Sequence, residues 1–120
     1  MKFDHNNCCL ITKNHEGIMV VFTKKQLDLK AKQRPELREE GILHRIEETI
    51  KNPTFIYEDY ENRKQRVAYY CYEYKIDGRD RYMKVMLSIH LDYLFVITAY
   101  RPDYIKERGK TNLLYGTHND

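Results

Sequence analysis

Two runs of strand-forming residues decide the fold: Arg81-Tyr-Met-Lys-Val-Met-Leu-Ser-Ile89 and Leu94-Phe-Val-Ile-Thr-Ala-Tyr-Arg101. Both are dense in β-branched, aromatic and aliphatic residues, which is typical of strands. The polar break His90-Leu-Asp92 predicts a short loop, so the two runs form an antiparallel hairpin at the centre of a sheet. We expect the rest of the chain to pack on this hairpin.

The apolar side chains predict the register of the hairpin. Successive strand residues point to opposite faces, and burial brings the apolar faces of the two strands together. This condition gives three cross-strand pairs: Leu87 with Phe95, Lys84 with Thr98, and Tyr82 with Tyr100. One face of the sheet then carries a cation, a hydroxyl and two phenols.

The segments before this hairpin predict a second hairpin and two helices. Residues 8–12 and 18–22 are short apolar runs on either side of a polar turn. Thr23 has the character of a helix N-cap, with Gln26 completing a capping box, and predicts a helix over residues 24–33. A second helical stretch covers residues 36–51 and restarts at Gly41.

A Tyr-rich strand over residues 67–75 follows a short strand at residues 54–57. Asp77-Gly78 is a strong signal for a two-residue hairpin turn, with Ile76 paired to Arg79. Counting back from that turn places Cys71 opposite Lys84. It also places Glu73 opposite Tyr82, on the polar face.

This order of elements predicts an α+β fold: an N-terminal hairpin and one or two helices packed on one face of a roughly four-stranded antiparallel sheet. At 120 residues the chain is expected to form a single domain, with residues 106–120 as a weakly ordered tail. The opposite face of the sheet is left for function or for a partner.

Composition narrows the class of protein. The net charge of +3 is compatible with an anionic polymer as ligand but does not demand one. No phosphate-loop, dinucleotide, zinc or nucleophile-elbow motif is present, so we expect no cofactor and no metal. No apolar run is long enough for a membrane span and the start lacks a signal-peptide pattern, which predicts a soluble cytoplasmic protein without membrane contact.

The three cysteines, two of them adjacent at Cys8 and Cys9, form neither an even disulfide framework nor a metal-ligand pattern. Reduced thiols are therefore expected. Adjacent strand residues point to opposite faces, which favours burial of Cys8 and Cys9 over joint chelation; a redox or metal site is the weaker alternative.

The polar face matches what metal-independent RNA cleavage requires. Attack of a 2′-hydroxyl on its own phosphate needs a base, a proton donor for the leaving oxygen, and cations around the phosphorane. Glu73 or Tyr100 is the candidate base, Lys84 with an arginine the phosphate clamp, and Thr98 a hydrogen-bond donor. The candidate substrate-binding residues are Tyr82, Arg81, Arg101 and Lys64. The same residue types on an exposed strand face also form ordinary cross-strand pairs.

Four short motifs resemble phage- and plasmid-associated domains of the barnase/EndoU/colicin/RelE-like ribonuclease superfamily. These motifs are Arg34-Pro-Glu-Leu37, Ile46-Glu-Glu-Thr-Ile-Lys-Asn-Pro53 with Ile56, Met83-Lys-Val85 and Val96-Ile-Thr-Ala-Tyr100. The similarity extends from Arg34 to Tyr100. It implies helices followed by a four-stranded antiparallel sheet and metal-independent RNA cleavage, often by a toxin, with RNA as substrate and an antitoxin or immunity protein as a candidate partner.

The resemblance also implies a site. A basic residue or His on the helical part, a strand cation and a last-strand Thr with Tyr correspond to Arg34, Lys84, Thr98 and Tyr100. Many members have His before Pro where this chain has Arg34, and His44 is a substitute candidate. An arginine binds phosphate but is not expected to exchange a proton at neutral pH.

A non-catalytic domain is the alternative. Tyr and Arg are enriched at binding hot spots, and bases of a single strand stack on aromatic rings. Such a domain would bind RNA or a protein through a Tyr-rich sheet face. The tyrosines that would supply this face are Tyr57, Tyr60, Tyr69, Tyr70, Tyr72 and Tyr74.

Overall fold

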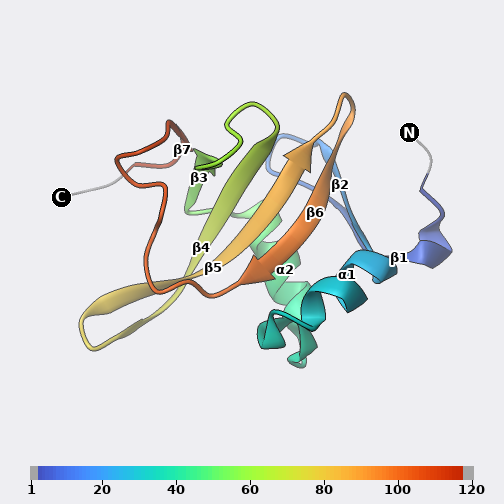
Figure 1. The fold of residues 1–120 in the computed structure, drawn as a ribbon, viewed down its shortest axis with the longest axis horizontal. Coiled ribbons are helices and arrows are strands. Elements are labelled where there is room, and N and C mark those ends of the chain that lie inside the picture. Colours follow the sequence, from blue (N-terminus) through green and yellow to red (C-terminus); the bar gives the residue numbers. More distant parts are fainter. Residues whose placement is uncertain (1–2, 118–120) are drawn as a thin grey trace.

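Residues 3–117 of this computed structural model form a seven-stranded sheet and two α-helices (Figure 1). The strands are β1 (Cys8–Lys13), β2 (Met19–Thr23), β3 (Phe55–Glu58), β4 (Arg66–Ile76), β5 (Arg79–Ile89), β6 (Tyr93–Tyr100) and β7 (Leu113–Tyr115). Their order across the sheet is β1-β2-β6-β5-β4-β3-β7. The helices are α1 (Lys24–Ala31) and α2 (Ile42–Lys51), with 3₁₀ turns η1 (His5–Asn7) and η2 (Pro35–Arg38).

The α+β class agrees with this architecture, but the expected four-stranded antiparallel sheet is wrong. The N-terminal hairpin joins the same sheet because β2 pairs with β6 in parallel, and β7 adds a strand beside β3. The three central residues of β2, Val20, Val21 and Phe22, are fully buried, as suits an interior strand with neighbours on both sides. Its apolar character indicated burial but contained no sign of which distant strand it would join.

Both helices begin where the sequence predicted. The Thr23 hydroxyl accepts a hydrogen bond from the backbone N–H of Gln26 and caps α1. Gly41, at φ 77°, precedes α2, so the helical stretch does restart there after η2. No helix within residues 3–117 has the length and apolar character needed to cross a membrane.

The sheet buries residues on both faces. On the first, here called the helix face, Ile46 and Ile50 of α2 pack with Met83, Val85 and Leu87 of β5. On the second, here called the strap face, Phe55, Tyr57, Ala68 and Tyr70 form a smaller cluster. Ile105 packs on this cluster. It belongs to residues 101–112, here called the strap, which run back along the sheet from β6 to β7 (Figure 1).

The strap differs from the weakly ordered tail expected for residues 106–120. Glu107 is completely buried, and residues 113–115 form β7. The hydroxyl of Thr111 donates to the backbone carbonyl of Glu58 at 2.8 Å, and Arg63 donates to the carbonyl of Lys110 at 2.7 Å. Of the predicted tail, residues 118–120 lie outside the described part of the chain. The second sheet face is therefore partly covered by the chain itself.

The β4–β5 turn is confirmed, but the register beyond it is not. Asp77 and Gly78 both have positive φ, 50° and 75°, and Ile76 pairs with Arg79. A bulge between Tyr72 and Tyr74 makes Glu73 the extra residue. Cys71 consequently pairs with Met83, and Tyr70 takes the predicted place of Cys71 opposite Lys84.

The predicted β5–β6 register was wrong, by two residues between Lys84 and Met86 and by one residue from Leu87 onward. Lys84 pairs with Tyr100 and Met86 with Thr98, while Leu87 pairs with Val96. Ile97 is left as a bulge residue. The bulge lets Val96 and Ala99 both enter the helix-face core, while Thr98 and Tyr100 line a pocket with Lys84. A shift of two keeps each side chain on its face, so the predicted neighbourhood of these three residues survives the change of register.

Candidate functional site

A pocket of about 230 Å³ lies on the strap face, where β5 and β6 meet the strap and the end of α1. Its lining includes a group of charged and hydroxyl-bearing side chains: Arg34, Lys84, Thr98, Tyr100, Lys106 and Glu107. Four of these six residues are ones that the sequence singled out. Lys106 and Glu107 come from the strap.

The floor of the pocket is a buried ion pair. The ammonium of Lys84 lies 2.9 Å from Oε2 of Glu107, and the two side chains are 3% and 1% exposed. The other oxygen of Glu107 accepts a hydrogen bond from the Tyr70 hydroxyl at 2.5 Å. Burial, and then the bond to Glu107, raises the pKa of Tyr70 well above its usual range, so Tyr70 stays a donor. The carboxylate is thus held from two sides.

The wall of the pocket is built by β6 and the segment before η2. The guanidinium carbon of Arg34 lies 3.9 Å from the centroid of the Tyr100 ring, which is a cation–π contact. The Lys84 ammonium lies 5.6 Å from the same ring. Thr98 lines the pocket, and its buried hydroxyl has no hydrogen-bond partner within residues 3–117. A buried hydroxyl without a hydrogen-bond partner destabilises the folded state unless another molecule supplies that partner.

The bulge in β6 determines where Thr98 and Tyr100 point. Its extra residue, Ile97, leaves the β5–β6 ladder, and its carbonyl accepts a hydrogen bond from the Gln26 side chain at 2.7 Å. The predicted capping box therefore forms only in part, because the Gln26 amide bonds to β6 instead of returning to Thr23. Helix α1 holds the bulge, and the bulge positions the pocket wall.

Several cations around the pocket have no acidic partner in the part of the chain that the structure describes. The lining includes Lys30, Arg34 and Arg66. None of the three forms an ion pair with another residue between 3 and 117. Lys106 lies 3.6 Å from Glu61, and both side chains are exposed, so solvent weakens this pair. These side chains can attract a polyanion to the pocket mouth.

Glu73 is not part of the pocket, contrary to the prediction. It lies on the helix face, where Arg45 of α2 approaches it to 3.5 Å. Its main partner is Arg101, whose Nε donates to it at 2.7 Å. Arg101 also bonds to Glu39 at 2.8 Å, and these carboxylates raise the pKa of Arg101. Glu73 and Arg101 therefore serve an ion-pair network that joins β4, the first residue of the strap and the segment before α2.

The other predicted residues also lie apart from the pocket lining. His44 is exposed on α2, Lys64 is exposed in the β3–β4 connection, and neither lines a pocket on the strap face. Arg81 donates to Asp103 of the strap at 3.1 Å. Tyr82 packs against Phe55, with ring centroids 5.9 Å apart. The structure brings together Lys84, Thr98, Tyr100 and Arg34 and separates the rest.

Sequence reasoning missed Glu107 and Tyr70. Glu107 lies in a segment without strand or helix periodicity, and only the need of a buried Lys84 for an anion could have indicated it. Tyr70 was assigned to a strand, but the bulge at Glu73 reversed the face on which it was expected.

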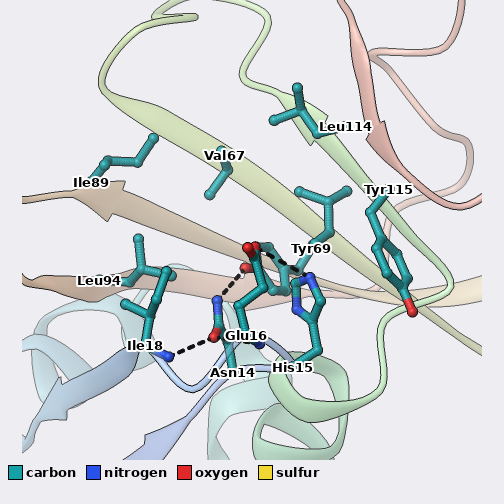
Figure 2. Close-up of a pocket in the computed structure, with 11 residues that line it drawn as sticks. Asn14, His15, Glu16, Ile18, Val67, Tyr69, Ile89, Leu94, Leu114 and Tyr115 are labelled. Carbon is teal, nitrogen blue, oxygen red and sulfur yellow. Dashed lines mark hydrogen bonds and ion pairs between the residues drawn. The ribbon is translucent and has the colours of Figure 1, made fainter.

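A second pocket, of about 210 Å³, opens where the β1–β2 turn meets β3, β4 and β7 (Figure 2). Its walls are mainly aliphatic, and no lysine or arginine of the described residues 3–117 lines it. Asn14 donates to the Tyr69 hydroxyl at 3.1 Å, and the His15 ring lies 4.7 Å from that of Tyr115, while the buried Nδ1 of His15 has no hydrogen-bond partner within residues 3–117. This pocket has no cation for a phosphate and is not the candidate site.

The thiols are protected. Burial raises the pKa of Cys9 to about 11, and the pKa values of Cys8 and Cys71 are raised by the same cause. A thiol with such a pKa is a poor nucleophile at neutral pH. Within residues 3–117, no three His, Cys, Asp or Glu side chains gather where they could hold a metal ion.

Comparisons with known proteins add no relative. No protein-family model matches the chain, and neither a curated protein nor a solved structure matches it. The likeness to the barnase/EndoU/colicin/RelE-like ribonucleases therefore stays a prediction from short motifs, and the chemistry has to be argued from the pocket.

Proposed function

We propose that this protein is an endoribonuclease that needs no metal ion and cleaves RNA by attack of a 2′-hydroxyl on the adjacent phosphate. The observation that carries the proposal is the strap-face pocket, which combines a carboxylate, an ammonium, a phenol and a guanidinium. These groups supply a base, a charge stabiliser and a proton donor.

Glu107 takes the role of base that the sequence assigned to Glu73 or Tyr100. A carboxylate held by Lys84 and Tyr70 is a fixed proton acceptor. Lys84 is 3% exposed, so substrate reaches it only when the strap shifts. In that step a phosphate oxygen replaces the Glu107 oxygen on Lys84, and Glu107 becomes free to accept a proton.

The reaction then balances without a cofactor. The 2′-hydroxyl gives its proton to Glu107 while the 2′-oxygen bonds to phosphorus. The bond from phosphorus to the 5′-oxygen breaks, and this oxygen takes the proton of the Tyr100 hydroxyl. Lys84 and Arg34 stabilise the charge on the phosphorane, and Thr98 donates a hydrogen bond to it. The products are a 2′,3′-cyclic phosphate and a 5′-hydroxyl.

The test is incubation of the purified protein with RNA in EDTA, beside Tyr100→Phe and Thr98→Val. Both substitutions keep the shape of the side chain and leave the Lys84–Glu107 pair in place, so they separate chemistry from folding. We expect cleavage by the native protein with cyclic-phosphate ends, and a loss of at least about a hundredfold in each variant, which is the low end for removing one catalytic group.

Intact RNA with the native protein would reject cleavage. The alternative is then an RNA-binding domain. Arg34 favours this alternative, because it stands where many of the ribonucleases that the chain resembles have a histidine. An arginine holds phosphate without exchanging a proton. The tyrosine face expected for such a domain is reduced, since Tyr57, Tyr69 and Tyr70 are buried. Tyr60, Tyr72 and Tyr74 remain exposed.

A further inference from the structure

Tyr104 of the strap lies at the border of two pockets. One, of about 320 Å³, adjoins the candidate site and is lined by Arg34, Lys84, Tyr100 and Lys106. The other, of about 350 Å³, lies toward the β4–β5 hairpin and is lined by Arg79, Tyr82 and Arg108. Asp103 and Tyr104 line both pockets. The two hollows are therefore neighbours along the strap, separated by Tyr104.

The Tyr104 ring is available for a ligand. It is 70% exposed, and within residues 3–117 no hydrogen bond, ring contact or cation–π contact is seen for it. The other tyrosines of this region are committed: Tyr70 bonds to Glu107, Tyr100 lies under Arg34, and Tyr82 packs on Phe55. A large, uncommitted aromatic side chain beside a polar pocket is a surface on which a planar group can stack.

Cations lie on both sides of the ring. Arg34 and Lys106 line the hollow on the side of the candidate site, and Arg79 and Arg108 line the other. Asp103, the acidic residue common to both hollows, is paired with Arg81 at 3.1 Å. An aromatic ring between two sets of cations is the arrangement by which proteins bind single-stranded nucleic acids, because the backbone follows the charges while a base stacks.

We propose that Tyr104 is a stacking subsite for an unpaired base of RNA, next to the nucleotide whose phosphate enters the Lys84 pocket. This inference rests on the proposed ribonuclease function and adds that the substrate is single-stranded at this position. A base within a duplex does not offer its face to a side chain, whereas an unpaired base does.

The chain contains no tryptophan, so Tyr104→Trp creates a unique fluorophore at the subsite. The probes are a short single-stranded RNA and its 2′-deoxy counterpart, which 2′-hydroxyl attack cannot cleave. We expect both probes to quench the tryptophan fluorescence of this variant, because a base stacks on the indole ring. The matched control is Tyr115→Trp. This position is 42% exposed and lies beside the aliphatic pocket at the β1–β2 turn, so the fluorescence of this variant should not be quenched.

Affinity provides the second measurement. Tyr104→Ala should weaken binding of the 2′-deoxy probe about tenfold, which is the size of one stacking contact, and Tyr104→Phe should restore it. Binding without quenching, or no binding at all, overturns the subsite. Quenching together with intact RNA supports the subsite and rejects the nuclease, so the two proposals fail separately.

Discussion

The ammonium of Lys84 and the carboxylate of Glu107 form a nearly inaccessible ion pair, with 2.9 Å between nitrogen and oxygen. The two residues come from the central strand β5 and from the strap. The pair therefore ties the C-terminal segment to the middle of the sheet. Two buried charges cost free energy to desolvate, and their attraction offsets this cost only while both are present.

Removing one partner should therefore destabilise the protein strongly. Lys84→Met or Glu107→Gln alone should lower the free energy of unfolding by about 3–5 kcal/mol, because each leaves an unpaired buried charge. The double variant should lose much less stability than the sum of the losses in the two single variants. It has no unpaired buried charge, and the oxygen of the glutamine amide that replaces the Glu107 carboxylate still accepts a hydrogen bond from Tyr70. Chemical denaturation of the four proteins measures the coupling, and additive losses would contradict the role of the pair.

Thr98→Val should stabilise the fold while it weakens cleavage. The hydroxyl of Thr98 is buried without a partner among residues 3–117, so its replacement by a methyl group should raise the free energy of unfolding by about 1 kcal/mol. The matched control is Thr49→Val, because the Thr49 hydroxyl donates to the Arg45 carbonyl at 2.9 Å. That substitution should destabilise by a similar amount. Equal effects at both positions would show that the Thr98 hydroxyl is bonded in solution.

Sequence predicted the parts of this fold that depend on local chemistry. The Thr23 cap, the restart at Gly41 and the Asp77-Gly78 turn all follow from short-range backbone preferences. The parallel pairing of β2 with β6 and the addition of β7 join segments far apart in the chain. Nothing in either segment specifies that partner.

The alternation of side chains along the strands predicted part of the candidate site. Alternation placed Lys84, Thr98 and Tyr100 on one face, and they do line one pocket. It placed Glu73 there as well, because a bulge in β4 has no signal in the residues around it. Glu107 lay outside any periodic segment, so only the three-dimensional path of the strap could reveal it.

The Gln26 side chain is expected to act as a positioning group for the pocket wall. Gln26→Met keeps the length of the side chain but removes the donor to the Ile97 carbonyl, and should cost about 1 kcal/mol of stability. Cleavage should fall through kcat with little change in KM, because Thr98 moves while the outer cations stay. Lys25→Met, at an exposed neighbouring position of α1, is the control and should change neither the stability nor the rate of cleavage.

Stability should fall at alkaline pH. Burial raises the pKa of Tyr69, Tyr70 and Tyr82 in the folded protein. A raised pKa means that the folded state keeps a proton that the unfolded chain loses. The stabilisation is complete below the unfolded pKa of about 10 and is lost as pH rises above it, by about 1.4 kcal/mol per pH unit for a residue such as Tyr70.

Urea unfolding at a series of pH values measures this slope, and Tyr70→Phe isolates one residue of it. The variant should be less stable than the native protein at pH 8, because Glu107 loses a donor. Above about pH 10 the free energy of unfolding of the variant should decline less steeply. The slope should differ by about 1.4 kcal/mol per pH unit, the value for one proton, because a phenylalanine has no proton to release in the unfolded chain. The buried thiols add a loss that begins at lower pH, and they are the same in both proteins. Identical slopes above about pH 10 would show that the Tyr70 hydroxyl ionises freely in the folded state, which is incompatible with the buried bond to Glu107.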